Sequence, residues 1–202
     1  LVSSLREEPG IQAWKANDRV LAKDCQLFII TDRSAFAAID KLAGRIAATR
    51  PDRVIPILKY RMESDVLLIV MPVVSGQCLT DYMADTAKPR SYSAIRSIIG
   101  EGADVLREVI ADTPSGIVIT TDTVRVTTSG VQIADAPCAT MLADTPATDL
   151  RTAGPERYAI RQLAALLYTL LTRTPSHATP TFNLRAWPQG TPGEVRVICK
   201  RG

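Results

Sequence analysis

The sequence predicts an α+β domain of two lobes, with a small strand-rich lobe over residues 1–75 and a mainly helical lobe over residues 76–202. Short apolar segments separated by polar turns fill the first part of the chain, which is typical of strands. Longer apolar stretches at helical spacing follow the pair Ser75-Gly76. With 202 residues and 46% hydrophobic content, the chain is long enough to fill the core of one domain.

The first lobe is expected to be a sheet interrupted by one helix. The predicted strands are Ile11–Ala16, Gln26–Thr31, Val54–Tyr60 and Val66–Val74. Between the second and third of them, residues Ala35–Arg50 carry apolar side chains at mostly helical spacing. Pro51 ends this helix, because a proline disfavours helical backbone in the residue before it.

The second lobe is expected to be helical around a small hairpin. The predicted helices are Leu79–Ala87, Ser91–Ile110 and Pro155–Leu171, and the last is so rich in leucine that we expect it to be buried. A short apolar piece, Ile117–Ile119, precedes two runs joined by Thr128-Ser129-Gly130, a pattern typical of a hairpin. For Glu194–Lys200, helix and strand both remain open.

The charge and the cysteine content argue against several functional classes. The 24 basic and 21 acidic side chains leave a net charge of +3 without a charged run, which does not indicate a nucleic-acid or membrane-surface partner. The four cysteines form no CxxC pair and His177 is the only histidine, so we expect neither a metal nor a cofactor. No signal peptide is visible, and no apolar run approaches the roughly 20 residues that span a bilayer.

Five segments resemble the motifs of protein kinases, and they occur in the kinase order. They are Gly10–Asp18 (end of the glycine-rich loop and second strand), Val70–Gly76 (gatekeeper, at Met71, and hinge), Leu79–Tyr82 (the next helix), Val124–Asp135 (the hairpin before the activation segment) and Leu163–Thr172 (the central helix). The chain is thus similar to protein kinases over residues 10–175. This resemblance implies a two-lobed protein-kinase-like fold.

The residues that kinases use for phosphoryl transfer are replaced at the matching positions. Phosphoryl transfer depends on positioning and on charge stabilisation by a few charged groups. The strand lysine matches Phe28, and the helix glutamate matches Lys41 or a near neighbour. In the catalytic-loop motif, the general base matches Val118, the lysine Thr120 and the metal-binding asparagine Thr123.

Other parts of the kinase machinery are reduced as well. Arg6–Pro9 puts two acids and a proline where a glycine-rich loop meets phosphates. The aspartate that opens the central helix matches Ala159, which fits the absence of a catalytic loop to brace. Asp135 alone survives from the metal-binding motif, and one carboxylate is a poor magnesium site.

These losses lead to three hypotheses. The first is a pseudokinase that is not an enzyme, has no catalytic, cofactor-binding or metal-binding residues, and acts by binding partners. The alternative is an atypical active Ser/Thr kinase or nucleotide-binding domain that uses Asp135 and a displaced lysine, Lys15 or Lys23. The third is an unrelated α+β ligand-binding domain. Trp187 is a candidate exposed anchor for a partner, with simple packing as the other interpretation.

A narrower resemblance rests on three short motifs: Val124-Arg125-Val126, Ala139-Thr140-Met141 and Leu167–Leu171. They are similar to motifs of the intracellular pseudokinase domain of actinobacterial MviN (MurJ), membrane proteins thought to flip the lipid-linked peptidoglycan precursor. The resemblance implies a cytoplasmic domain of a plasma-membrane protein, attached to transmembrane segments outside this chain, that regulates cell-wall synthesis.

The same resemblance implies two partners and no nucleic acid. An upstream Ser/Thr kinase phosphorylates a threonine near the carboxyl end of such domains, and a forkhead-associated (FHA) domain protein then binds it. The position of this threonine stays open, inside the chain or beyond Gly202. The abrupt ends at Leu1 and Gly202 are compatible with a piece of a longer protein.

Overall fold

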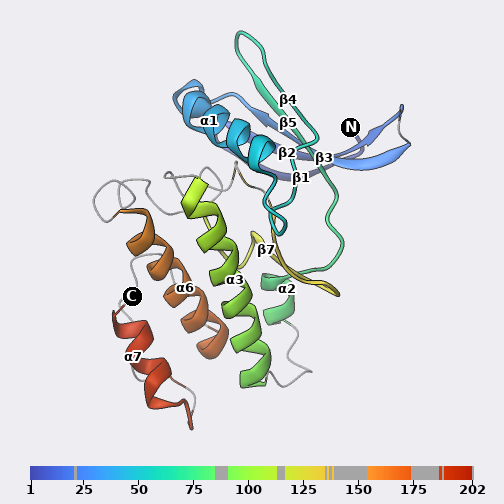
Figure 1. Ribbon diagram of the computed structural model, residues 1–202. Helices are drawn as coiled ribbons and strands as arrows, with labels where there is room; N and C mark the ends of the chain where they lie inside the picture. Colours follow the sequence, from blue (N-terminus) through green and yellow to red (C-terminus); the bar gives the residue numbers. More distant parts are fainter. Residues whose placement is uncertain are drawn as a thin grey trace.

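A computed structural model describes residues 1–20, 22–84, 91–112, 117–134, 136, 138, 154–173, 187 and 189–201 (Figure 1). A sheet with one helix lies at one end of the molecule, and the remaining helices lie at the other end. This is the predicted α+β arrangement of a strand-rich lobe and a helical lobe.

The first lobe holds a five-stranded antiparallel sheet in the order β1-β2-β3-β5-β4. The strands are β1 (Ser3–Glu8), β2 (Ile11–Asp18), β3 (Lys23–Ile30), β4 (Lys59–Met62) and β5 (Leu67–Pro72). Helix α1 (Arg33–Thr49) begins where the Asp32 carboxylate accepts a hydrogen bond from the backbone of Ser34, and it ends before Pro51 as predicted.

Two strand predictions were wrong in this lobe. Strand β1 was missed, because nearly all of its side chains face solvent and leave no apolar alternation to detect. The predicted strand Val54–Tyr60 begins only at Lys59. Val54 and Ile55 are apolar because they are buried against other parts of the molecule, and Pro56 interrupts the segment.

The second lobe consists of α2 (Leu79–Ala84), α3 (Tyr92–Asp112), α6 (Pro155–Thr172) and α7 (Gly193–Arg201). A small sheet of β6 (Gln77–Cys78), β7 (Val124–Thr127) and β8 (Gly130–Ile133) contains the predicted hairpin. Helix α6 is central and mostly buried, as expected, and α7 settles the open question at Glu194–Lys200 in favour of a helix. Ile117–Ile119 forms no strand.

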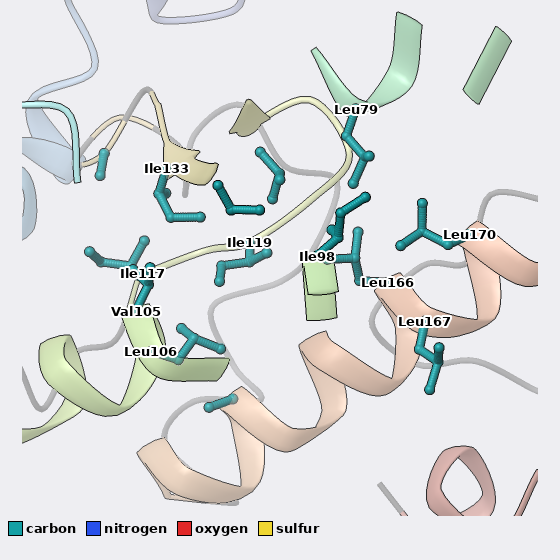
Figure 2. Close-up of a cluster of buried hydrophobic side chains, with 14 of the residues drawn as sticks. Leu79, Ile98, Val105, Leu106, Ile117, Ile119, Ile133, Leu166, Leu167 and Leu170 are labelled. Carbon is teal, nitrogen blue, oxygen red and sulfur yellow. The ribbon is translucent and has the colours of Figure 1, made fainter. Parts of the chain in front are cut away.

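Two hydrophobic clusters form the core, one centred in each lobe, and the second-lobe cluster also takes in Leu42 and Ile46 of α1. The second-lobe cluster packs α3 and α6 around the hairpin and includes Leu79, Ile98, Leu106, Ile133 and Leu170 (Figure 2). The first-lobe cluster lies between the sheet and α1. Ile57 packs against both clusters, so the two cores are joined. None of the described helices has both the length and the apolar character needed to cross a membrane.

Candidate functional site

The candidate site is the region where the first-lobe sheet meets the second lobe, and Phe28 is its central residue. Phe28 lies on β3 between Ala13 of β2 and Ile69 of β5, and its side chain is 0% exposed. It belongs to the first-lobe cluster, which also contains Ala134 and Cys138 from the second lobe. The residue that the sequence analysis matched to the kinase lysine is therefore a phenyl ring inside an apolar cluster that spans both lobes.

Helix α1 brings no charge to this cluster. Lys41, predicted at or near the glutamate position, is exposed on α1. Ile39 is the buried α1 residue of this cluster, at 2% exposed, and the partly buried Ala35 and Phe36 of α1 pack against it. Phe28 and Ile39, both apolar and buried, thus lie in one cluster, and Lys41 lies outside it.

The connection from β1 to β2 is a two-residue turn at Pro9-Gly10, because Glu8 already pairs with Ile11. Gly10 has a φ of 80°, which suits the glycine after the proline in a type II turn. A Cβ atom at Gly10 would lie 2.7 Å from the Cβ of Asp32 at the start of α1. This turn lies close to the start of α1. Only two residues connect β1 to β2, so the connection is a tight turn and not an extended loop.

The segment that matches the catalytic loop is closed by its own hydrogen bonds. Val118 and Thr123 are buried, at 5% and 3% exposed, and Thr120 is half-buried. The Thr123 hydroxyl oxygen accepts from the backbone N–H of Thr120 at 2.8 Å, and the hydroxyl lies 3.3 Å from the Val118 carbonyl. The polar groups at two of the replaced positions are therefore used to hold the loop itself.

Helix α6 braces this segment through Gln162, a residue that the sequence analysis missed. The Gln162 side chain is 4% exposed; its oxygen accepts from the backbone N–H of Ile119, and its nitrogen donates to the Ile117 carbonyl at 3.2 Å. Ala159 has no polar side-chain group that could make such a contact. Gln162, three residues further along α6, holds the segment instead.

The displaced-lysine hypothesis has one candidate on the correct side of the sheet. Lys15 lies two residues after Ala13, so it faces the same side of β2 as Ala13 and Phe28. Its ammonium is 2.8 Å from the Asp24 carboxylate, and hydrogen bonding to Lys15 lowers the pKa of that carboxyl below its ordinary value. Lys23 is exposed at the start of β3. Asp135, the other group of this hypothesis, lies outside the described residues, as does Ala139-Thr140-Met141.

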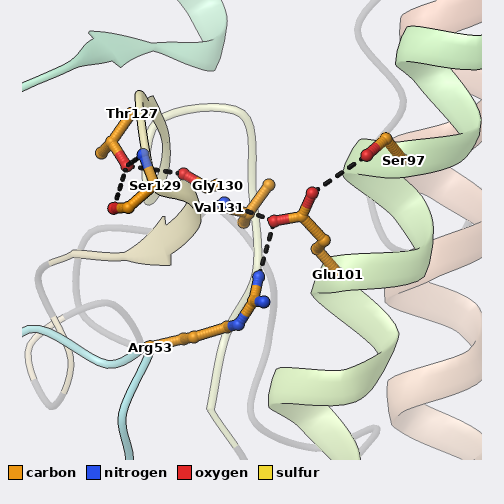
Figure 3. Close-up of polar contacts among 7 residues, drawn as sticks. All are labelled: Arg53, Ser97, Glu101, Thr127, Ser129, Gly130 and Val131. Atoms are coloured by element: carbon orange, nitrogen blue, oxygen red, sulfur yellow. Dashed lines mark hydrogen bonds and ion pairs between the residues drawn. The ribbon is translucent and has the colours of Figure 1, made fainter.

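A polar contact beside the site joins the lobes (Figure 3). Glu101 of α3 accepts from Arg53 Nη1 at 2.6 Å and from the Val131 backbone N–H at 2.7 Å through one oxygen, and from the Ser97 hydroxyl at 2.9 Å through the other. The Val131 N–H bond, with help from Ser97 and Arg53, holds the pKa of the Glu101 carboxyl below its ordinary value of 4.5, although burial acts the other way.

This contact ties three segments that are far apart in the sequence. Arg53 precedes β4, Glu101 lies on α3, and Val131 lies on β8. The Arg53 carbonyl also accepts from the Ile133 N–H at 2.8 Å. Sequence analysis missed the network because no local pattern links residues so far apart.

Trp187 is not an exposed anchor for a partner, so that interpretation was wrong. Its side chain is 8% exposed and packs edge-on against Tyr168 of α6, with ring centroids 5.5 Å apart. The packing alternative holds. Among the described residues, no group of three or more His, Cys, Asp or Glu side chains could hold a metal ion.

The sheet order, the helix that packs on the sheet, the hairpin and the central helix together define a protein-kinase-like fold. A crystal structure of Rad53 in complex with AMP-PNP matches 99% of this chain with a TM-score of 0.73 and 17% identity; the chain spans 58% of the Rad53 chain. The Mycobacterium tuberculosis PknI kinase domain matches 90% of this chain, and 75% of its own, with a TM-score of 0.65 and 17% identity. No protein-family model and no curated protein matches the sequence.

Proposed function

We propose that this domain is a pseudokinase, a kinase-like domain that transfers no phosphate and acts by binding other proteins. The observation that carries the proposal is the fully buried Phe28 at the position of the kinase lysine. A phenyl ring offers nucleotide phosphates neither a positive charge nor a hydrogen bond, and phosphoryl transfer depends on both.

Three further features support the proposal. The buried α1 side chain in the cluster is the apolar Ile39, and the turn at Pro9-Gly10 is too short to wrap around phosphates. The hydroxyl of Thr123, at the position of the metal-binding asparagine, is engaged within its own loop. Each feature removes a separate group that would stabilise the charge of a nucleotide and its metal.

A thermal-shift titration with ATP and magnesium tests this part. Ligand binding to the native state must raise the melting temperature, by an amount set by the ratio of ligand concentration to Kd. We expect no shift up to millimolar ATP, with Rad53 and AMP-PNP as the positive control. A saturable rise in the melting temperature of this domain would overturn the pseudokinase assignment.

The alternative, an atypical active kinase or nucleotide-binding domain using Asp135 and a displaced lysine, is favoured by one observation. Lys15 faces the same side of the sheet as Phe28. Its ion pair with Asp24 competes with any such role. If ATP raises the melting temperature of the parent domain and Lys15→Ala abolishes that rise while Lys23→Ala does not, the alternative replaces the pseudokinase.

We further propose a role in the regulation of peptidoglycan synthesis, as the cytoplasmic domain of a plasma-membrane protein. Support comes from the resemblance of Val124-Arg125-Val126, Ala139-Thr140-Met141 and Leu167–Leu171 to the MviN (MurJ) pseudokinase domain. In this proposal an upstream Ser/Thr kinase adds a phosphate, with about −1.5 to −2 charge, that an FHA domain protein reads.

The full-length gene product tests this second part. Transmembrane segments joined to this domain, together with phosphorylation-dependent binding of an FHA domain protein to the whole protein, are the expected results. A full-length product without transmembrane segments would contradict the cell-wall role and leave the pseudokinase assignment untouched.

A further inference from the structure

Strand β4 forms one edge of the first-lobe sheet, with β5 as its only neighbouring strand among the described residues. Its residues pair with β5 in continuous register from Lys59 to Met62, and all four side chains are exposed. In Figure 1 the β4–β5 hairpin extends beyond the rest of the sheet. Such an edge presents unpaired backbone N–H and C=O groups, to which another strand can add.

The opposite edge of the same sheet is different. In β1 the register with β2 shifts between Ser4 and Arg6, which marks a bulge. Bulges bend an edge strand and hinder pairing with a further strand. The regular edge at β4 is therefore the better template for strand addition.

One side of β4 is apolar. Tyr60 and Met62 are 41% and 47% exposed, and they lie on the same side of the sheet as their buried partners on β5, Ile69 and Leu67. A Cβ atom at Gly44 of α1 would lie 3.8 Å from the Tyr60 hydroxyl oxygen. Helix α1 thus reaches Tyr60 but leaves it exposed, so the apolar inner surface of the sheet continues into solvent at this edge.

The other side of β4 is basic. Lys59 and Arg61 alternate with Tyr60 and Met62, so they point to the opposite face. Arg61 shares an exposed ion pair with Glu63 at 3.2 Å, and the described residues contain no ion pair to Lys59. A strand added here would place its own alternate side chains beside an apolar row on one face and a cationic row on the other.

We propose that β4 is a docking edge for an extended segment of another protein, whose apolar and acidic side chains alternate and which adds to the sheet as a sixth strand. A second copy of this chain does not fit, because pairing two β4 strands would bring the cations of both copies together. The inference rests on the proposed function, an interaction domain, and deepens it by naming the surface and the chemistry of the partner.

A labelled synthetic peptide that alternates valine and glutamate tests the proposal by fluorescence anisotropy. We expect saturable binding, with slower hydrogen exchange at Lys59–Met62, and no binding of a peptide with the same composition in scrambled order. The charge reversal K59E/R61E should weaken binding of the valine–glutamate peptide about tenfold, because two exposed ion pairs are lost and like charges then repel. The same variant should bind a valine–lysine peptide better than the parent domain does.

The double variant R19E/K23E is the matched control. It changes the net charge by the same amount in the same lobe, at exposed positions away from β4, so it should leave binding unchanged. Absence of binding, equal binding of the scrambled peptide, equal losses in both double variants, or dimerisation through β4 would each overturn strand addition. The thermal-shift titration with ATP is independent of the peptide-binding assay. Failure of strand addition can therefore be told apart from failure of the pseudokinase assignment.

Discussion

At the scale of single residues, Phe28 has the clearest consequence. Its ring is fully buried, with Ala13 and Ile69 as its cross-strand neighbours. Ile39 of α1 shares the apolar cluster around it. A lysine at position 28 would therefore replace a packed ring with a buried charge in apolar surroundings. Burying an unpaired charge costs folding free energy.

We predict that Phe28→Lys lowers the free energy of unfolding by at least about 3 kcal/mol, since it combines a cavity with a buried charge. Phe28→Leu keeps the site apolar and should cost only about 1–1.5 kcal/mol. Urea unfolding followed by circular dichroism measures both. A stable Phe28→Lys variant that gains affinity for ATP would show that the cluster can open into a nucleotide site.

Gln162 is the second residue with a specific expected effect. Gln162→Leu preserves volume but leaves the Ile119 N–H and the Ile117 carbonyl buried without partners, which should cost about 2–4 kcal/mol. Ile160→Ala, on the exposed side of the same helix, should change stability by less than about 0.5 kcal/mol. Hydrogen exchange at the Ile119 amide should quicken in the first variant. Unchanged protection there would contradict the brace.

At the scale of elements, Gly130 at the start of β8 lets α3 approach the hairpin. It has a φ of 114°, and a Cβ atom there would clash with a Glu101 carboxylate oxygen. Gly130→Ala should cost about 1–3 kcal/mol through backbone strain and displacement of that carboxylate. The same substitution at Gly100, a helical position with open space around it, should instead stabilise by about 0.5–1 kcal/mol. Equal effects at both sites would refute this explanation.

The Glu101 contact also predicts a pH dependence. Hydrogen bonds to the Val131 backbone, Ser97 and Arg53 lower the pKa of Glu101 in the folded state, below the 4.5 that it has when unfolded. Its contribution to stability is therefore fully present above pH 4.5 and is lost as the pH falls through the folded-state pKa. The difference in unfolding free energy between the parent and Glu101→Gln should be constant near neutral pH and shrink below pH 4.5. A difference that stays constant in acid would contradict the network.

Elements also show where sequence patterns succeed and fail. Helix α6 and the β7–β8 hairpin were predicted because their apolar periodicity and turn residues are local signals. Strand β1 was missed, because its side chains face solvent and its sequence reads like a loop. Val54 was assigned to a strand because it begins a short apolar segment, which is typical of a strand. In the structure it is apolar because it is buried in the second-lobe cluster.

At the scale of the whole molecule, the two lobes are expected to unfold together. Ile57 packs against both clusters, Ala134 and Cys138 of the second lobe enter the first-lobe cluster, and Arg53 is bonded to Glu101. These contacts couple the two cores, which favours a single cooperative transition.

The two tryptophans allow a direct test, since Trp14 lies on β2 and Trp187 packs on α6. Trp187→Phe leaves Trp14 as the probe of the first lobe, and Trp14→Phe leaves Trp187 as the probe of the second. Unfolding in urea should give the same midpoint with both probes. Weakening two of the links with Ile57→Ala and Arg53→Ala should move the two midpoints apart. Distinct midpoints without these changes would mean that the lobes are independent.

The sequence by itself determined the two-lobed α+β class, helices α1, α3 and α6 and the β7–β8 hairpin, because these follow from local periodicity and turn residues. It also supplied the matches of Phe28, Val118 and Thr123 to kinase positions, which rest on residue identity and spacing. Only the tertiary structure decided that Phe28 is sealed inside a cluster shared by both lobes, that Gln162 braces the loop, and that Glu101 joins three distant segments. Burial and long-range hydrogen bonds depend on which segments meet in space, and no local pattern of residues encodes those meetings.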